Sequence, residues 1–257
     1  MAAIASTIRR IVPPQYRPIG YLVSLTQRRT GLVVRSGPFA GMRYGLSSVG
    51  SAYIPKLLGI YERELASIIE KACSEDHPLI IDIGAAEGYY AVGLAIRNPS
   101  ARVVAFEMEA PGRDALSRMA EANDVHTRIE IRGKCEAQDL EAVMTGVSSP
   151  LLICDVEGCE DSLLDPAASP SLCRADILVE LHDFIVPGVS ELLQTRFESS
   201  HAIQLIHQEP RNRDEFPWRT VVTTLLPRSY HDWAVSEWRP VPMSWLYMRS
   251  KTNHRVA

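Results

Sequence analysis

The length and composition of this chain limit what it can be. It has 257 residues, 46% of them hydrophobic, so it can bury a sizeable core, and α/β domains of this size are often single. The net charge of −4 gives no basic surface of the kind that binds nucleic acid. We therefore expect no nucleic-acid partner.

The cysteines and the N-terminus bear on location. The five cysteines form no C-x-x-C pair and lie mostly in apolar runs, which indicates a reduced, cytoplasmic protein. The N-terminus is basic and mildly amphipathic, with Ile4, Ile8 and Ile11 on one side, but it contains no long apolar stretch. Neither a signal peptide nor a membrane span is expected. We expect a short helix that packs on the body or on a partner, the alternative being a membrane-surface anchor.

Two further elements precede the main alternation. Residues 32–46 read LVVRSGPFAGMRYGL, two short runs around a Gly-Pro turn, which predicts a β-hairpin. Residues 60–73 then have apolar residues at helical spacing. Glu62 lies at the start of this helix, where it either faces a ligand or is an ordinary first-turn acid.

From residue 79 onward, apolar strands alternate with helices. This pattern predicts an α/β fold, a Rossmann-like, doubly wound sheet with helices on both faces. The expected domains are an N-terminal helix and β-hairpin extension over 1–59 and one sheet domain over 60–257. The seven predicted strands are 79–83, 102–106, 128–132, 150–155, 175–181, 202–207 and 244–248.

The segment 208–243, before the last strand, is long for a loop. It carries three of the four tryptophans together with several arginines, so it should have structure of its own. It either covers a ligand pocket or is a packed surface insertion.

The first chemical pattern is the small-residue turn GAAEG at 84–88, between a buried strand and a helix. Small residues let a ligand come close to the main chain, and the helix N-terminus presents unpaired N–H groups. Glu107, at the tip of the next strand, is placed to accept hydrogen bonds from ribose hydroxyls. The alternative is an ordinary turn with a solvated Glu107.

The second pattern is LLICDVEGCEDSLL, residues 151–164. Asp155 ends a strand and so lies at the carboxyl edge of the sheet, where open α/β sheets bind ligands. Glu157 follows two residues later, and His182 ends the next strand. Carboxylates beside an imidazole make a candidate site for proton removal.

These motifs resemble a known family. The runs IDIGAAEGYYAVGLA, VVAFEMEAPGRDAL and CDVEGCEDSLL are similar to the FkbM-like group of class I S-adenosylmethionine-dependent methyltransferases, over roughly residues 60–205. That family has AFEP after its second strand and DVEGxE after its fourth, and Met108 stands in place of the Pro. The resemblance implies methyl transfer from S-adenosylmethionine, most often to a hydroxyl oxygen of a small-molecule or sugar-like acceptor.

The site residues that we predict fall into two groups. The catalytic candidates are His182, as the base, with Asp155 and Glu157. The cofactor contacts are predicted to be Asp82, Gly84, Ala86, Glu87, Gly88, Tyr89, Glu107, Met108, Cys135, Glu136 and Asp155.

A second likeness concerns metal. The segment LHDFIVPG, 181–188, is similar to catechol-type O-methyltransferases, in which two ligands of a divalent cation precede a Pro-Gly. By that likeness the ligands would be Asp155, His182 and Asp183, and a histidine would suit a softer metal than magnesium. A hydrogen-bonded acid/base cluster remains the favoured interpretation.

Two other functions stay open. An NAD-dependent oxidoreductase would use a related fold, but its fingerprint G-x-G-x-x-G has a third glycine, whereas this chain reads D-x-G-x-x-x-G. A nucleotide-binding module without catalysis is the other alternative, against which intact Asp82, Glu107 and Asp155 argue. The sequence is also compatible with a homo-oligomer.

Overall fold

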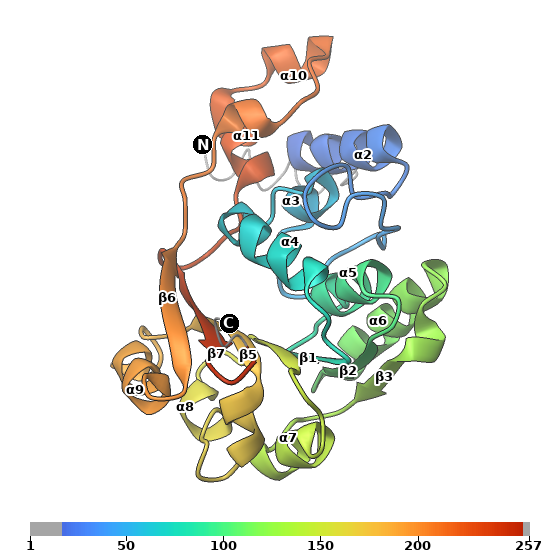
Figure 1. Ribbon diagram of the computed structural model, residues 1–257. Helices are drawn as coiled ribbons and strands as arrows, with labels where there is room; N and C mark the ends of the chain where they lie inside the picture. The colour runs from blue at the N-terminus through green and yellow to red at the C-terminus, as the bar shows by residue number, and fades with distance from the viewer. Residues whose placement is uncertain (1–16, 254–257) are drawn as a thin grey trace. The chain divides into compact units, whose positions relative to one another are not determined.

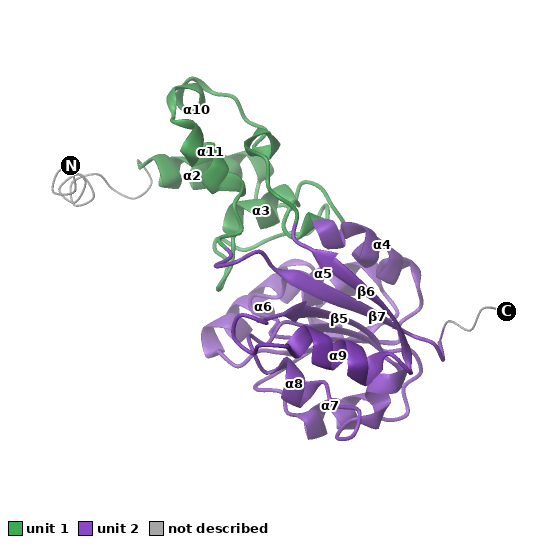
Figure 2. Cartoon of the chain, turned by 90° about the vertical axis from the view of Figure 1, so that its left-hand side faces the viewer, with its two compact units in different colours: residues 1–63, 209–238 green, residues 64–208, 239–257 purple. Residues whose placement is uncertain are grey.

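The computed structural model describes residues 17–253 (Figure 1). The chain forms two compact units, each built from two separate stretches of sequence (Figure 2). The first unit comprises 1–63 and 209–238, and the second comprises 64–208 and 239–257. The observed division thus falls at residue 63, and most of the insertion groups with the N-terminal stretch.

The second unit is organised around a seven-stranded sheet with the order β3-β2-β1-β4-β5-β7-β6. Strands β1 to β5 are parallel to one another, and β7 runs antiparallel to both β5 and β6. The strands are β1 (Leu79–Ile83), β2 (Arg102–Phe106), β3 (Ile129–Arg132), β4 (Leu151–Cys154), β5 (Asp176–Leu181), β6 (His201–His207) and β7 (Ser244–Ser250). All seven predicted strands are confirmed within two residues at either end.

Helices cover both faces of this sheet, as predicted (Figure 2). Helices α5 and α6 pack on β1, β2 and β3, and α7, α8 and α9 line the opposite face. The helices of this unit are α4 (Ala66–Ser74), α5 (Tyr89–Arg97), α6 (Ala110–Ala122), α7 (Ala137–Met144), α8 (Glu160–Leu163) and α9 (Val189–Phe197), with short 3-10 turns at Arg63–Leu65, His126–Arg128 and Pro170–Arg174.

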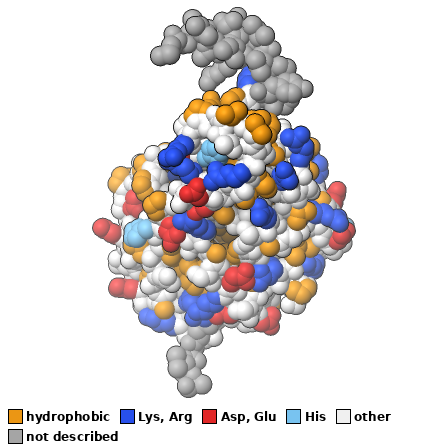
Figure 3. All heavy atoms as spheres, turned by 90° about the horizontal axis from the view of Figure 1, so that it is seen from above, with side chains coloured by type: hydrophobic (Ala, Val, Ile, Leu, Met, Phe, Trp, Pro, Cys, Tyr) orange, Lys and Arg blue, Asp and Glu red, His pale blue; other side chains and the backbone are white. Residues whose placement is uncertain are grey.

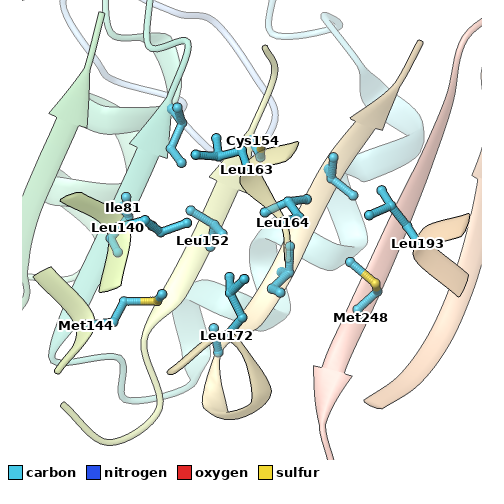
Figure 4. Packing of buried hydrophobic residues seen from close by; sticks show 14 of the residues in the cluster. Ile81, Leu140, Met144, Leu152, Cys154, Leu163, Leu164, Leu172, Leu193 and Met248 are labelled. Atoms are coloured by element: carbon cyan, nitrogen blue, oxygen red, sulfur yellow. The ribbon is translucent and has the colours of Figure 1, made fainter. Parts of the chain in front are cut away.

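Burial explains why the central parallel strands are mostly apolar. All five residues of β1 are buried, and alternate strand residues such as Ile81 and Leu152 point into a core shared with Leu140 and Leu193 of the helices (Figure 4). Each such side chain contributes about 1.5–3 kcal/mol when it is fully buried. Strands covered on both faces have few positions that face solvent, so they form nearly continuous hydrophobic runs in the sequence.

The first unit has a smaller core of its own. Buried Leu22, Ile54, Phe216 and Val235 join its two stretches of sequence, and Trp218 and Trp233 pack against them. Its helices are α2 (Pro18–Thr30), α3 (Tyr53–Leu58), α10 (Val221–Leu225) and α11 (Arg228–Val235), with a 3-10 turn at Arg213–Glu215. The tryptophan-rich segment therefore carries helices that are packed by their own aromatic side chains.

Two N-terminal expectations have different outcomes. The predicted hairpin over 32–46 is reduced to one antiparallel bridge, between Val33 and Arg43, with main-chain hydrogen bonds beside it. Glycines at positive φ, Gly37 and Gly41, turn the chain too tightly for longer strands. The helix expected around Ile4 to Ile11 lies outside the described residues.

The surface composition and the length of the helices concern possible nucleic-acid and membrane partners. Acidic, basic and hydrophobic side chains are interspersed on the face that Figure 3 presents. Among residues 17–253, no helix combines the length and the apolar character that crossing a bilayer requires.

One close approach sets the geometry at the carboxyl edge of the sheet. Gly84, which follows β1, has φ +80°, and a Cβ atom there would lie 1.7 Å from the carbonyl oxygen of Asp155. This contact involves main chain, so it cannot relax by a side-chain rotation. The glycine is needed to bring the ends of β1 and β4 together.

We predict that Gly84→Ala lowers the free energy of unfolding by at least about 3 kcal/mol, because the methyl group would force the two strand ends apart. Gly146→Ala is the matched control. Gly146 has nearly the same φ, +79°, but open space around its Cβ position, so only the left-handed strain of about 1–2 kcal/mol should appear. Urea denaturation measures both changes, and equal losses would contradict the steric explanation.

Candidate functional site

The loop after β1 is held against the end of β2 by main-chain hydrogen bonds. The N–H groups of Gly84 and Ala85 both donate to the carbonyl oxygen of Phe106, at 3.0 Å. Gly88 closes the loop and begins α5 at φ +92°. Ala86 is left-handed at φ +47°, a conformation that a non-glycine residue adopts only under local constraint and that is enriched at functional sites.

Glu107 supplies that constraint. One oxygen of its half-buried carboxylate, Oε2, accepts the N–H of Ala86 at 2.8 Å, and Oε1 accepts the N–H of Glu109 at 2.6 Å. Each carboxylate oxygen has a second lone pair, so both retain capacity for a ligand hydroxyl. Gly112 of α6 leaves space for the side chain of Glu107, because a Cβ atom at position 112 would lie 2.7 Å from Cγ of Glu107. Sequence reasoning did not identify Gly112.

The other predicted cofactor residues differ in their surroundings. Asp82, Glu87 and Tyr89 are buried, whereas Met108 is 64% exposed beside Glu107. Packing alone explains a glycine at position 88, since a Cβ atom there would lie 2.8 Å from the side chain of Leu116. A ligand role for these residues remains a prediction.

Cys135 and Glu136 follow β3. Burial, and then the negative charge of Asp139, raise the pKa of the Cys135 thiol to about 12, so this sulfur is not a thiolate. Glu136 caps the N-terminus of α7, where it and Asp139 form a reciprocal capping box. Glu136 therefore has a structural role as well as its predicted cofactor contact.

The second cluster lies where β4 and β5 end side by side. Cys154 is paired in register with Val179, so the residues that follow both strands meet at one edge. Nε2 of His182 lies 3.7 Å from Oδ1 of Asp155 and 3.6 Å from Oε1 of Glu180. The structure thus brings the predicted base together with one of its two predicted partners.

The closest partner of His182 was not predicted. Nδ1 of the imidazole lies 2.5 Å from Oε1 of Glu160, the first residue of α8, whose side chain is fully buried. The N–H of Gly158 also donates to that oxygen, at 3.1 Å. The sequence held a signal, because Glu160 is the last position of the DVEGxE pattern.

The charges around the ring decide its protonation. Burial of His182 lowers the pKa of the imidazole, but the hydrogen bond to Glu160 and the charges of Asp155 and Glu157 outweigh it, so the pKa is raised. For Glu160, burial raises the carboxyl pKa, and the hydrogen bond to His182 with the backbone donors lowers it overall. The pair therefore favours a protonated imidazole on an ionised carboxylate.

Two predicted residues lie apart from this contact. Glu157 is exposed, in the left-handed conformation at φ +47°, and acts on His182 through its charge. Asp183 turns to the start of α9, where Oδ1 accepts the backbone N–H and the hydroxyl of Ser190 at 3.3 and 3.1 Å. Asp183 thus accepts hydrogen bonds from the first turn of α9, and it is not in the group of ligand atoms that lie together beside His182.

Glu180 takes the place predicted for Asp183. Ligand atoms of Asp155, Glu180 and His182 all lie within 4.8 Å of one another. Glu180 is buried and forms an ion pair with Arg239, at 2.5 Å, and the guanidinium also lies over the ring of Trp245. These contacts join residues about 60 positions apart, which explains why the sequence did not reveal them.

Known proteins share the fold of this chain. No protein-family model matches the chain. It is similar to the human methyltransferase 10 domain containing protein, with 12% identity and a TM-score of 0.50 over 89% of this chain and 96% of that one. The chain has a Rossmann-like methyltransferase fold.

Two further similarities are more limited. An O-methyltransferase from Bacillus cereus, solved with SAH, shows 12% identity and a TM-score of 0.48 over 96% of this chain and 97% of its own. A release factor glutamine methyltransferase of Chlorobaculum tepidum is 41% identical over 68 residues, 26% of this chain. That match spans only 22% of the relative's length. The FkbM-like subfamily stays a prediction.

We predict that Glu160→Gln lowers the pKa of His182, because it removes the ionised acceptor that stabilises the imidazolium. Glu157→Gln is the control, and it should lower the pKa less because Glu157 is exposed and makes its contribution through solvent. NMR titration of the seven histidines measures both, with His182→Gln to assign the signal. A larger effect of Glu157→Gln would contradict this ranking.

Proposed function

We propose that this chain is an S-adenosylmethionine-dependent methyltransferase that transfers the methyl group to a hydroxyl oxygen of a small-molecule or sugar-like acceptor. The observation that carries the proposal is the hydrogen bond from the left-handed Ala86 to Glu107. It holds an acid with spare acceptor capacity over a small-residue loop, at the start of α5. An acid at that strand tip suits ribose hydroxyls, and the loop suits close approach of a ligand.

The chemistry asks little of the protein beyond alignment and proton uptake. S-adenosylmethionine, when bound, supplies a methyl group already activated by its sulfonium. The chain has to hold the acceptor oxygen in line with that methyl group and to take the proton that the hydroxyl loses as the oxygen–carbon bond forms.

The second cluster provides groups for that proton. Asp155 is 42% exposed, so it can contact an acceptor, whereas the side chain of His182 is only 5% exposed. We assign Asp155 to orient the acceptor hydroxyl and His182 to receive the proton at Nε2. Glu160 holds Nδ1–H and so leaves Nε2 as the basic atom. Glu157, which is exposed, adds negative charge that raises the pKa of His182.

A metal-assisted variant of the same reaction is the second candidate. Asp155, Glu180 and His182 offer a nitrogen and two oxygens, which suits a borderline divalent ion such as Zn²⁺. An ion there would orient the acceptor and lower its pKa. The ion pair between Glu180 and Arg239 competes with metal for the carboxylate, so the hydrogen-bonded cluster is favoured.

We predict that Glu107→Ala weakens S-adenosylhomocysteine binding at least about tenfold, because charge-assisted hydrogen bonds contribute on the order of 1.5–3 kcal/mol. Isothermal calorimetry measures the affinity. Glu109→Ala is the matched control, since it removes a neighbouring exposed acid and keeps the N–H that Glu107 accepts.

Thermal shift with NAD, run in parallel, tests the rival cofactor. S-adenosylhomocysteine should raise the melting temperature and NAD should not. Unchanged affinity in a folded Glu107→Ala protein, or stabilisation by NAD alone, would reject the assignment.

We predict that methyl transfer by the base mechanism rises with pH through an ionisation above the usual histidine value of roughly 6.5, since the pKa of His182 is raised and only the neutral ring accepts a proton. Activity should be insensitive to EDTA, whereas metal assistance predicts loss in EDTA and recovery with a specific ion. His182→Ala should reduce turnover under both mechanisms but preserve S-adenosylhomocysteine binding. Full activity of that variant would reject both.

A further inference from the structure

A second group of ligating side chains lies at the opposite, amino edge of the sheet. Glu75 follows α4 as its C-cap, His77 lies just before β1, and Asp176 begins β5, about 100 residues further along the chain. One ligand atom from each lies within 4.8 Å of the other two. His77 and Asp176 are buried, and Glu75 is half-buried.

The imidazole of His77 is oriented as a ligand. Its Nδ1 lies 3.0 Å from the carbonyl oxygen of Ser149, which can only accept, so Nδ1 carries the hydrogen. In the neutral ring that a metal ligand requires, Nε2 is then a bare lone pair. Metal-binding histidines are held in this way, with the second ring N–H on a backbone carbonyl.

Nε2 of His77 lies near a carboxylate oxygen and has no hydrogen bond. His77 is 2% exposed, and within residues 17–253 neither its Nε2 nor Oε2 of Glu75 has a hydrogen-bond partner. The two atoms lie 3.7 Å apart, too far for a hydrogen bond. Two buried acceptors that face each other repel unless a cation lies between them.

The other contacts orient the two carboxylates. Oδ1 of Asp176 accepts the N–H of Ser250 at 2.8 Å, and Oε1 of Glu75 accepts from Arg249 at 2.6 Å. The protein thus holds one oxygen of each carboxylate in place. Zinc bonds to nitrogen and carboxylate oxygen are about 2.0–2.2 Å, so the ligand atoms of a tetrahedral zinc lie about 3.4 Å apart. The ligand atoms of this group lie within 4.8 Å of one another, so they need to close by about 1.4 Å at most.

We propose that Glu75, His77 and Asp176 form a structural binding site for a divalent ion of the Zn²⁺ type. One nitrogen and two carboxylate oxygens suit zinc better than calcium or magnesium, which prefer all-oxygen sites. The ion would join the entry to β1 with the first residue of β5. It would lie at the edge of the sheet away from Glu107 and His182, so its role is stability and not methyl transfer.

The test uses the full-length protein, stripped with EDTA and desalted, then titrated with ZnCl₂. We expect about one zinc per chain by mass spectrometry after gel filtration, and a higher melting temperature, since an ion that binds only the folded state stabilises it. His77→Gln and Glu75→Gln should each weaken zinc binding at least about tenfold. Glu75→Gln is the safer variant because Glu75 is half-buried, and circular dichroism checks that it folds.

His182→Gln is the matched control, because it removes the ligand nitrogen of the group at the carboxyl edge. Zinc retained in His182→Gln and lost in Glu75→Gln supports the proposal. Zinc lost in His182→Gln alone, unchanged zinc affinity in folded Glu75→Gln, or no zinc binding by the wild type each overturns it. None of these outcomes depends on methyltransferase activity.

Discussion

The ends of β1 and β4 approach each other so closely that Gly84 has no room for a side chain against the main chain of Asp155. This constraint positions both halves of the candidate site. The loop that Glu107 holds through Ala86 begins at that glycine, and Asp155 is the first residue of the segment that leads to Glu160. The loop proposed to bind the cofactor and the proposed acid/base cluster are therefore joined through a backbone contact, without a flexible connection.

His182 and His77, two of the buried histidines of the second unit, show how one residue type acquires different chemistry. The Nδ1 atom of His182 faces the ionised carboxylate of Glu160, which raises the pKa of the ring and suits proton uptake. The Nδ1 atom of His77 faces a neutral carbonyl, which fixes the tautomer without adding charge. A charged acceptor at Nδ1 raises the basicity of the imidazole. A neutral acceptor at Nδ1 fixes the tautomer and leaves the Nε2 lone pair for a cation.

Most of the sheet could be predicted because its signals are local. Strand β1 and the helix after Gly88 follow from apolar runs, small residues and the stop at Asn98, all within a few positions. The hairpin over 32–46 was predicted too long because local β-propensity ignores the tight glycine turns. The antiparallel place of β7 between β5 and β6 has no local signal at all, since it depends on which strand edges are free when the chain returns.

The sequence by itself determined the fold class, the carboxyl-edge position of Glu107, Asp155 and His182, and the acid/base character of the second motif. These depend on strand order and on residue type at strand ends. Only the tertiary structure decided that Glu160 holds His182, that Glu180 pairs with Arg239 and replaces Asp183, and that Glu75, His77 and Asp176 meet. The reason is physical, because such contacts depend on register and side-chain rotamers across strands that are distant in the chain, and these are set when the core packs.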